Sequence, residues 1–365
     1  MPFQVLRAAT LLLAAASASA VLAAEDFRVR YNLAGSLGGE IFAPQSSSGW
    51  IGALAYTYID GRKVTGDDGN KLGTTTPPGT VPLSRQATPR DPVYNANRVA
   101  LQTSGHANVM ALALGYITEE RYGGGQLIFG TLLPLAQNAS EVRASAASPT
   151  LNWPHPTQPV DTTKAIVQGQ FATGYQTQLS DLTAAESGKI SGIGDIELAA
   201  GWMRQDGPWK FRAGAAWVLP TGAYSATKRP NIGFGNYHTL RPEVQATYLP
   251  SAKIALSGKL IMGFNSRNKD KQLKSGNWIG LEATAGYMTP IGPVGLHGVH
   301  VRQYQDDQNN LMFGSSRLQL TGLGAFFTTR LPVIDTIVTL QYMVTTHSRN
   351  ARHSNFSQLR LVQQF

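Results

Sequence analysis

Residues 209–219 read WKFRAGAAWVL, and they alternate strictly between two kinds of side chain. One face of the expected strand carries Trp209, Trp217 and smaller apolar residues, and the other carries Lys210 and Arg212. A period of two indicates a β-strand whose two faces meet different surroundings. A soluble sandwich would bury the aromatic face as its core. A membrane barrel would place the aromatic residues at the two lipid–water boundaries and the charges in an aqueous interior. This stretch alone allows both folds.

The beginning of the chain indicates that the protein is exported. Residues 1–24 combine an early cation, Arg7, with an apolar run over residues 8–16 and small residues suited to cleavage after it. This pattern predicts a secretory signal peptide, which is left out of the fold. The peptide is too short to span a membrane as a helix, and no later stretch approaches the ~18 consecutive apolar residues that a spanning helix needs. We therefore expect an exported chain that is either soluble or barrel-forming.

Composition narrows the choice further. The chain has no cysteine, which excludes a lipoprotein anchor, disulfides and thiolate metal sites. Charged residues make up 15% of it, well below the usual ~25%, and it contains 38 glycines, as expected of strands and turns that face lipid. The formal net charge of +9 could suggest nucleic acid, but export argues against that partner. The cations gather in expected loops, where lipopolysaccharide and other outer-membrane lipids are the predicted partners, unless the loops are simply solvated.

Alternating segments recur along the chain and predict a single all-β domain. Short turns rich in Pro, Gly or Ser alternate with longer polar loops, which is typical of an outer-membrane barrel with short periplasmic turns and long extracellular loops. The repeat of about 40 residues also resembles a propeller blade, but a blade needs four strands where about two are found. We predict an antiparallel transmembrane β-barrel of about 12 strands, over residues 50–59, 108–116, 126–135, 196–202, 209–219, 239–249, 253–265, 277–289, 294–304, 317–328, 336–346 and 355–365.

Three regions fall outside these strands. Residues 25–48 are rich in glycine and do not alternate, so we interpret them as a periplasmic N-terminal arm that the lumen could also accommodate, with the barrel over residues 49–365. Residues 60–97 predict a long polar loop. Residues 136–193 are ambiguous, because the alternation over residues 167–176 allows one more strand. A full span there would break the even strand count, so we place it in an extracellular excursion.

The last strand ends the chain on Phe365. A terminal aromatic residue that closes an alternating strand resembles the signal which outer-membrane barrels present to the barrel assembly machinery, and this machinery is a predicted partner. Together with the strand ends considered above, the pattern predicts aromatic residues at the membrane interfaces, namely Trp202, Trp209, Trp217 and Phe365.

A series of short motifs resembles a known family. In order, the motifs are GIGD at residues 192–195, LPTGAY at 219–224, NIGFGNY at 231–237, FNSRN at 264–268, SG at 275–276 and YQDD at 304–307. The series resembles the family of outer-membrane transporters named for the meta-pathway of phenol degradation, over roughly residue 192 to the C-terminus. The resemblance implies a barrel and the uptake of aromatic compounds across the bacterial outer membrane.

The sequence offers little catalytic chemistry. It lacks the G-x-S-x-G, H-E-x-x-H and phosphate-loop motifs. His297 and His300 are three apart and point to opposite faces of their strand, so they cannot form one site alone. Clustered aspartates such as Asp306 and Asp307 could hold calcium, but turn formation explains them better. We predict no catalytic residues, no metal site and no cofactor.

The charged residues on the faces opposite the apolar stripes matter more for function. We expect eight of them to line the lumen: Lys210, Arg212, Arg241, Glu243, Lys259, Glu282, Arg317 and Arg360. Six are cations and two are carboxylates, a difference of 6 − 2 = +4, which favours anions in a narrow pore. The prediction is a passive channel for small hydrophobic or aromatic, and partly anionic, solutes. The alternatives are a salt-bridge lattice in a closed structural barrel and a lipid-modifying enzyme.

Overall fold

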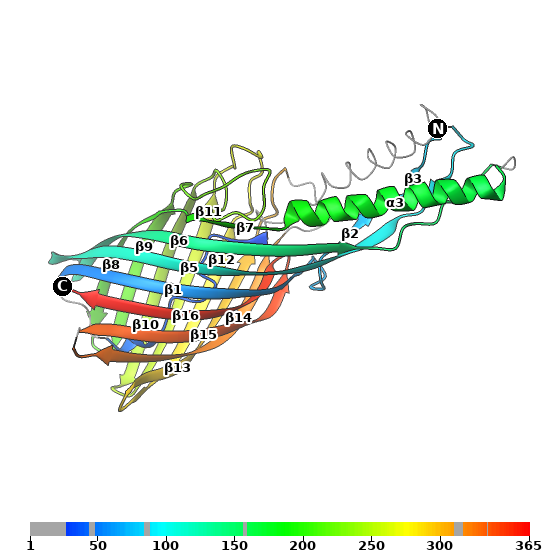
Figure 1. The fold of residues 1–365 in the computed structure, drawn as a ribbon. Helices are drawn as coiled ribbons and strands as arrows, with labels where there is room; N and C mark the ends of the chain where they lie inside the picture. Colours follow the sequence, from blue (N-terminus) through cyan, green and yellow to red (C-terminus); the bar gives the residue numbers. More distant parts are fainter. Residues whose placement is uncertain (1–26, 44–47, 84–87, 156–158, 310–316, 334) are drawn as a thin grey trace. The chain divides into compact units, whose positions relative to one another are not determined.

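The computed structural model describes residues 27–43, 48–83, 88–155, 159–309, 317–333 and 335–365, and its main unit is a closed β-barrel (Figure 1). Closure follows from the pairing, because β1 bonds to both β5 and β16, and β5 also bonds to β6. The prediction of an antiparallel barrel with 12 strands is confirmed. The twelve are β1 (Gly49–Val64), β5 (Asn97–Tyr122), β6 (Gly125–Ser145), β8 (Glu197–Asp206), β9 (Trp209–Val218), β10 (Thr239–Ser251), β11 (Ile254–Asn265), β12 (Trp278–Thr289), β13 (Gly292–Gln303), β14 (Gln319–Leu331), β15 (Thr336–Arg349) and β16 (Arg352–Gln364). A further short strand, β7 (Gly188–Ile193), also pairs with β6.

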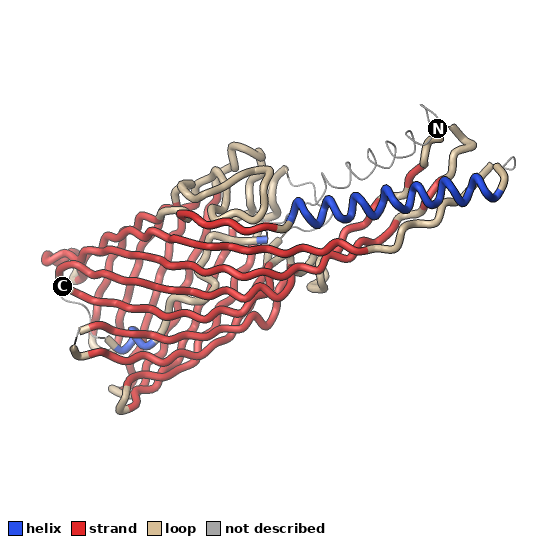
Figure 2. Tube along the Cα trace, in the orientation of Figure 1, coloured by secondary structure: helices blue, strands red, loops and turns tan. Residues whose placement is uncertain are grey.

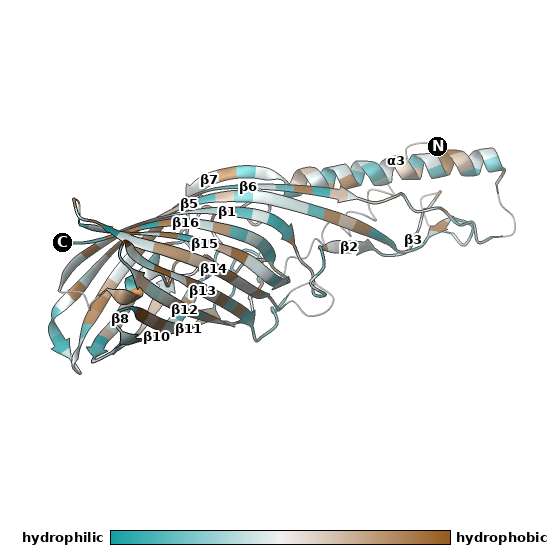
Figure 3. Cartoon of the chain, turned by 90° about the horizontal axis from the view of Figure 1, so that it is seen from below, coloured by the Kyte–Doolittle hydropathy of each residue, from teal (hydrophilic) through white to brown (hydrophobic). Residues whose placement is uncertain are grey.

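The two faces of the wall differ as the alternation predicts. On β12, Trp278 and Glu282 point inward and are buried, whereas Leu281 and Tyr287 point outward and are about half exposed. Hydrophobic and polar residues follow one another along the strands in Figure 3. Among the described helices, none is long and apolar enough to cross a membrane. A closed barrel with an apolar outer face belongs in the bacterial outer membrane.

The two ends of the barrel carry different connections. At the short-turn end, β8 and β9 are joined through Gly207 (φ +54°), and β5 and β6 through Gly123 (φ +59°) and Gly124 (φ +75°). These left-handed angles suit glycine, which has no Cβ. At the long-loop end, residues 219–238, 266–277 and 304–318 connect the strands. The connection between β15 and β16 is an exception, with only Asn350 and Ala351. The predicted asymmetry of the connections otherwise holds.

A second compact unit is formed by residues 71–103 and 141–188. It contains β2 (Gly73–Thr76), β3 (Gly79–Thr80), β4 (Val93–Tyr94) and the helix α3 (Asp161–Glu186), and β5 and β6 continue into it beyond their predicted bounds. Its core packs Tyr94, Leu151 and the buried face of α3. Burial, and then the neighbouring Tyr175, raises the pKa of Tyr94, so the Tyr94 hydroxyl is neutral at neutral pH.

The suggestion of a strand over residues 167–176 is therefore wrong, because this segment lies within α3. Its buried side chains include Val167, Phe171, Tyr175 and Leu179, each four residues after the last. A spacing of four fits both a strand, with a period of two, and a helix, with a period of 3.6. The alternation could not separate the two.

The N-terminal arm, residues 27–43, lies inside the barrel. Its Val29 and Ala34 belong to one buried cluster with inward side chains of the wall, among them Ile261, Trp278 and Met343. The short 3-10 helix η1 (Gly39–Phe42) is visible between the strands in Figure 2. Of the two places that the sequence allowed for this arm, the structure has the lumen. Residues 1–24, the predicted signal peptide, lie outside the described residues.

Candidate functional site

The lumen is the candidate site, and the arm is fixed in it at three levels. Nearest the long-loop end, Arg30 donates two bonds to Asp195 Oδ2, of 3.1 Å from Nε and 2.9 Å from Nη2. Arg30 also donates to the carbonyls of Gly235 (3.1 Å) and Tyr237, and its guanidinium lies 3.9 Å from the ring centroid of Tyr237. Both charged side chains are almost completely buried. A buried ion pair is stable when its remaining donors are satisfied, and here the loop carbonyls satisfy them.

The segment 231–237, one of the motifs that suggested the family, binds two arginines of the arm, Arg28 and Arg30. Arg28 donates to the carbonyls of Asn231 (3.2 Å) and Gly233 (3.1 Å) and lies 4.5 Å from the ring centroid of Phe234. The loop is tightly folded, since a Cβ on Gly222 would lie 2.6 Å from the Cα of Gly233. The backbone of the motif thus binds the arm.

At the middle level, the buried carboxylate of Glu282 collects bonds from the arm. It accepts bonds from the hydroxyl of Tyr31 (2.6 Å), from the backbone N–H groups of Ser36 (2.8 Å) and Leu37 (3.2 Å), and from Ser36 Oγ (3.0 Å). Only 4% of Glu282 is exposed, so these bonds replace the water that the charge has lost.

At the same level, the backbone of the arm at Ala34 and Gly35 lies close to the barrel wall. Gln341 Nε2 donates to the carbonyl of Ala34 at 2.8 Å. The next residue, Gly35, has φ +83°, and a Cβ there would lie 3.0 Å from Nδ1 of His297. Any side chain at this position would meet both backbone strain and a steric contact.

The third level lies nearest the short-turn end. Glu40 accepts bonds from Arg360 Nε (2.7 Å) and Nη2 (2.8 Å) and from Thr339 Oγ1 (2.8 Å). Lys210 Nζ donates to the carbonyls of Ile41, at 2.8 Å, and Ala43. The arm is therefore held along its whole described length.

Five of the eight side chains expected to line the lumen bind this arm. Besides Lys210, Glu282 and Arg360, Arg241 donates to the carbonyl of Arg30 at 2.9 Å and pairs with Glu197. Lys259 donates to Ser36 Oγ and pairs with Glu243, each at 3.0 Å. The sequence count of +4 omitted Glu40, Asp195 and Glu197. The alternation places Glu197 on the same face as Ala199, so it could have been counted, but alternation does not indicate which cations these carboxylates meet. Arg212 is also on the inner face but does not bind the arm.

Arg317 is a correction to the expected lining. It precedes the start of β14 at Gln319, is exposed, and pairs with Asp306 at 2.9 Å. The inner face of β14 begins with Leu318 and Leu320, which are buried, so the predicted strand had the wrong parity at its start. Among the described residues, no group of three or more His, Asp or Glu is placed to hold a metal ion.

The inner faces of β1, β5, β6, β8 and β9 carry small side chains instead. Directly opposite residues share a face, and here they include Ala55 with Ala111 and Ala199 with Ala216. Ala199 is exposed and the other three are half-buried, whereas Thr339 and Met343 on the inner face of β15 have no exposed surface. Since an alanine Cβ on the inner face points into the barrel, its exposure indicates open lumen beside these five strands.

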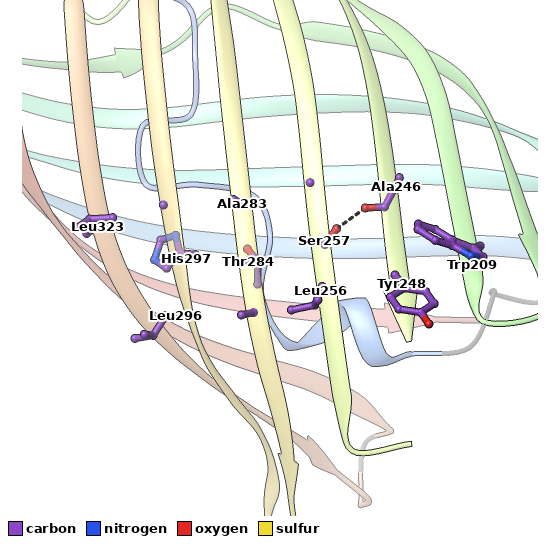
Figure 4. Close-up of a pocket in the computed structure, with 13 residues that line it drawn as sticks. Trp209, Ala246, Tyr248, Leu256, Ser257, Ala283, Thr284, Leu296, His297 and Leu323 are labelled. Carbon is purple, nitrogen blue, oxygen red and sulfur yellow. Dashed lines mark hydrogen bonds between the residues drawn. The ribbon is translucent and has the colours of Figure 1, made fainter. Parts of the chain in front are cut away.

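A hollow of about 760 Å³ lies on the opposite, outward face of the wall (Figure 4). Small residues such as Gly258 and Ala283 leave the space, and Leu256, Leu296 and Leu323 surround it with 46–69% of their surface exposed. These side chains face lipid. The hollow is therefore separate from the lumen.

The histidines considered for catalysis lie on opposite faces, as their spacing predicts. His297 points inward and lies 3.1 Å from Gln341 Nε2, measured from Nδ1. On the outward face, His300 Nδ1 is 2.8 Å from Thr321 Oγ1. The two do not share a site.

The expected interface aromatics are outward residues, and all but Trp202, which is in the middle of β8, lie near strand ends. Trp209, Trp217 and Phe365 have 42%, 48% and 68% of their surface exposed. Trp202 donates its indole N–H to the carbonyl of Tyr122 at 2.7 Å. Their role at the membrane boundaries remains a prediction.

Comparison with known proteins places this geometry in context. The family model described as "Putative MetA-pathway of phenol degradation" matches residues 88–361. The solved structure of the COG4313 outer membrane channel from Pseudomonas putida F1 is 15% identical and superimposes with a TM-score of 0.61, covering 90% of this chain and 100% of that chain. At that identity the likeness shows the fold alone. The CymD monoaromatic hydrocarbon channel is 12% identical, with a TM-score of 0.37 and coverage of 94% of this chain and 97% of that chain. No curated protein matches the sequence.

Proposed function

The chain belongs to the family described by that model, and we propose that it is a passive outer-membrane channel for small hydrophobic or aromatic solutes. The observation that carries the proposal is that the arm fills one side of the lumen and leaves the other side open. The arm packs mainly against β10–β16, with one further contact to Lys210 of β9, and the small inner side chains of β1, β5, β6, β8 and β9 leave space beside it. This space is the route that we propose for solutes.

The chemistry of the route fits the proposed solutes. Alanine and glycine dominate its wall, at positions such as Ala55, Ala113, Gly201 and Gly214. Such a wall accepts flat apolar molecules without displacing bound side chains, and it offers sugars few hydrogen-bond partners. The name of the Pseudomonas putida channel supports a channel role, and the family description supports an aromatic solute. We further propose that the barrel faces outer-membrane lipid and lipopolysaccharide, and that its terminal strand is read by the assembly machinery.

The test compares solutes that do not cross lipid by themselves. Liposomes that contain the purified barrel should swell faster in phenyl glucoside and benzenesulfonate than in the matched non-aromatic solutes, glucose and methanesulfonate. Liposomes without protein are the control. A purely structural barrel with a closed lumen predicts no swelling with any of the four.

We propose no catalytic activity. A lipid-modifying enzyme needs a nucleophile and a base on the lipid face, and the outward pair of His300 and Thr321 comes nearest to that requirement. Phospholipid hydrolysis by the purified barrel that disappears in His300→Ala would overturn this part of the proposal.

A further inference from the structure

We propose that Arg212 is the binding point for the carboxylate of a small aromatic acid as it passes through the lumen. The inference rests on the proposed channel function and adds to it the charge of the solute and the residue that recognises it.

Arg212 belongs to the open side of the lumen. It pairs across β9 with Met203 of β8 and Gln245 of β10, and both neighbours are on inner faces. Arg212 lies within the strand, and its side chain is nevertheless partly exposed, so part of it reaches the open side of the lumen. It is therefore within reach of a solute that follows the proposed route.

Arg212 also differs from the other cations of this lumen. Lys210, Arg241, Lys259 and Arg360 all bind the arm or a carboxylate of the wall. In the described part of the chain, Arg212 has electrostatic neighbours but makes no hydrogen bond or ion pair.

The carboxylates near Arg212 are already occupied. Glu243 and Glu40 act on it electrostatically, but Glu243 pairs with Lys259 and Glu40 with Arg360. Each carboxylate thus already has a cation partner, and neither bonds Arg212 in the structure. The positive charge is therefore left to attract an anion from the lumen water.

The surroundings select the kind of anion. Gly214 follows Arg212 on the same inner face, Gly201 lies opposite Gly214 on β8, and Ala199 lies further along β8, so the wall on this side is small and apolar. A guanidinium binds a carboxylate through two parallel N–H···O bonds, and a narrow low-dielectric wall strengthens the attraction. One charged group beside an apolar surface suits a solute with one carboxylate and one ring.

The test measures ion selectivity in planar bilayers at pH 8, where benzoate is fully ionised. The permeability ratio of benzoate to potassium, obtained from the reversal potential, should fall about fivefold in Arg212→Gln, the loss expected for one partly exposed ion pair. Arg302→Gln is the matched control, because Arg302 is also exposed but lies on the outward face of β13. It should leave the ratio unchanged.

Swelling with phenyl glucoside separates the two proposals. If wild type and Arg212→Gln both pass phenyl glucoside and their benzoate ratios are equal, the anion site is wrong and the channel stands. If the wild type passes neither phenyl glucoside nor benzoate, the channel itself is wrong and the site falls with it.

Discussion

The two sides of the lumen use opposite kinds of residues. The inner faces of β10–β16 carry large and charged side chains, and nearly all of them are buried against the arm or one another, as Glu282, Gln341 and Met343 are. The inner faces of β1, β5, β6, β8 and β9 carry mainly small side chains, with Glu197, Lys210 and Arg212 as charged exceptions, and they remain partly open, as Ala199 does. The side of the lumen formed by β10–β16 holds the arm, and the side formed by β1, β5, β6, β8 and β9 leaves the proposed route open. An inner-face charge that is paired with the arm or the wall is thus poor evidence for a solute path.

Removing the arm should have the largest effect on this contrast. A deletion of residues 27–43 empties the side that is now filled, so single-channel conductance should rise several-fold, since pore width controls conduction in barrels. Heat-modifiable migration on gels checks that the barrel still folds. A folded deletion variant with wild-type conductance would show that the arm does not fill the path.

The next largest effect is expected from removing the buried ion pair that holds the arm near the long-loop end. Arg30→Ala leaves Asp195 as an unpaired buried charge, which should lower the free energy of unfolding by about 3–5 kcal/mol. Urea unfolding of the barrel in lipid vesicles measures it. Arg204→Ala is the control, because the pair of Arg204 with Asp206 is exposed and should contribute about 0–1 kcal/mol. Equal losses in the two variants would contradict the role given to Arg30.

A smaller effect is expected at the other end of the arm. Arg360→Gln removes the partly exposed pair with Glu40, whose side chains are 13% and 24% exposed, and should cost about 2 kcal/mol. A loosened arm should also add brief changes of current to single-channel recordings. Arg330→Gln, which breaks an exposed pair with Asp335, should change neither quantity. Quiet recordings and unchanged stability in Arg360→Gln would mean that this contact does not hold the arm.

The parts of the structure that could be predicted from the sequence are those whose apolar and polar residues recur with a clear period. Strands such as β12 alternate cleanly, so the fold, the strand count and the inward direction of Glu282 could be predicted. The arm has no period, and its partners lie more than 160 residues away, as Arg30 and Asp195 do. Alternation assigns a face to a charged residue but not its partner. The helix α3 was missed because its buried residues are spaced by four, which satisfies both periods.

Adjacent alanines on β8 offer the most direct test of the passage. Ala199 points into the open side of the lumen, and Ala200 points outward to lipid, where tryptophan is tolerated. The measurement is liposome swelling with phenyl glucoside for Ala199→Trp and Ala200→Trp. We expect Ala199→Trp to reduce the rate several-fold, because the indole fills the space beside β8, and Ala200→Trp to leave it unchanged. Equal rates for both variants and wild type would contradict a passage along this side of the lumen.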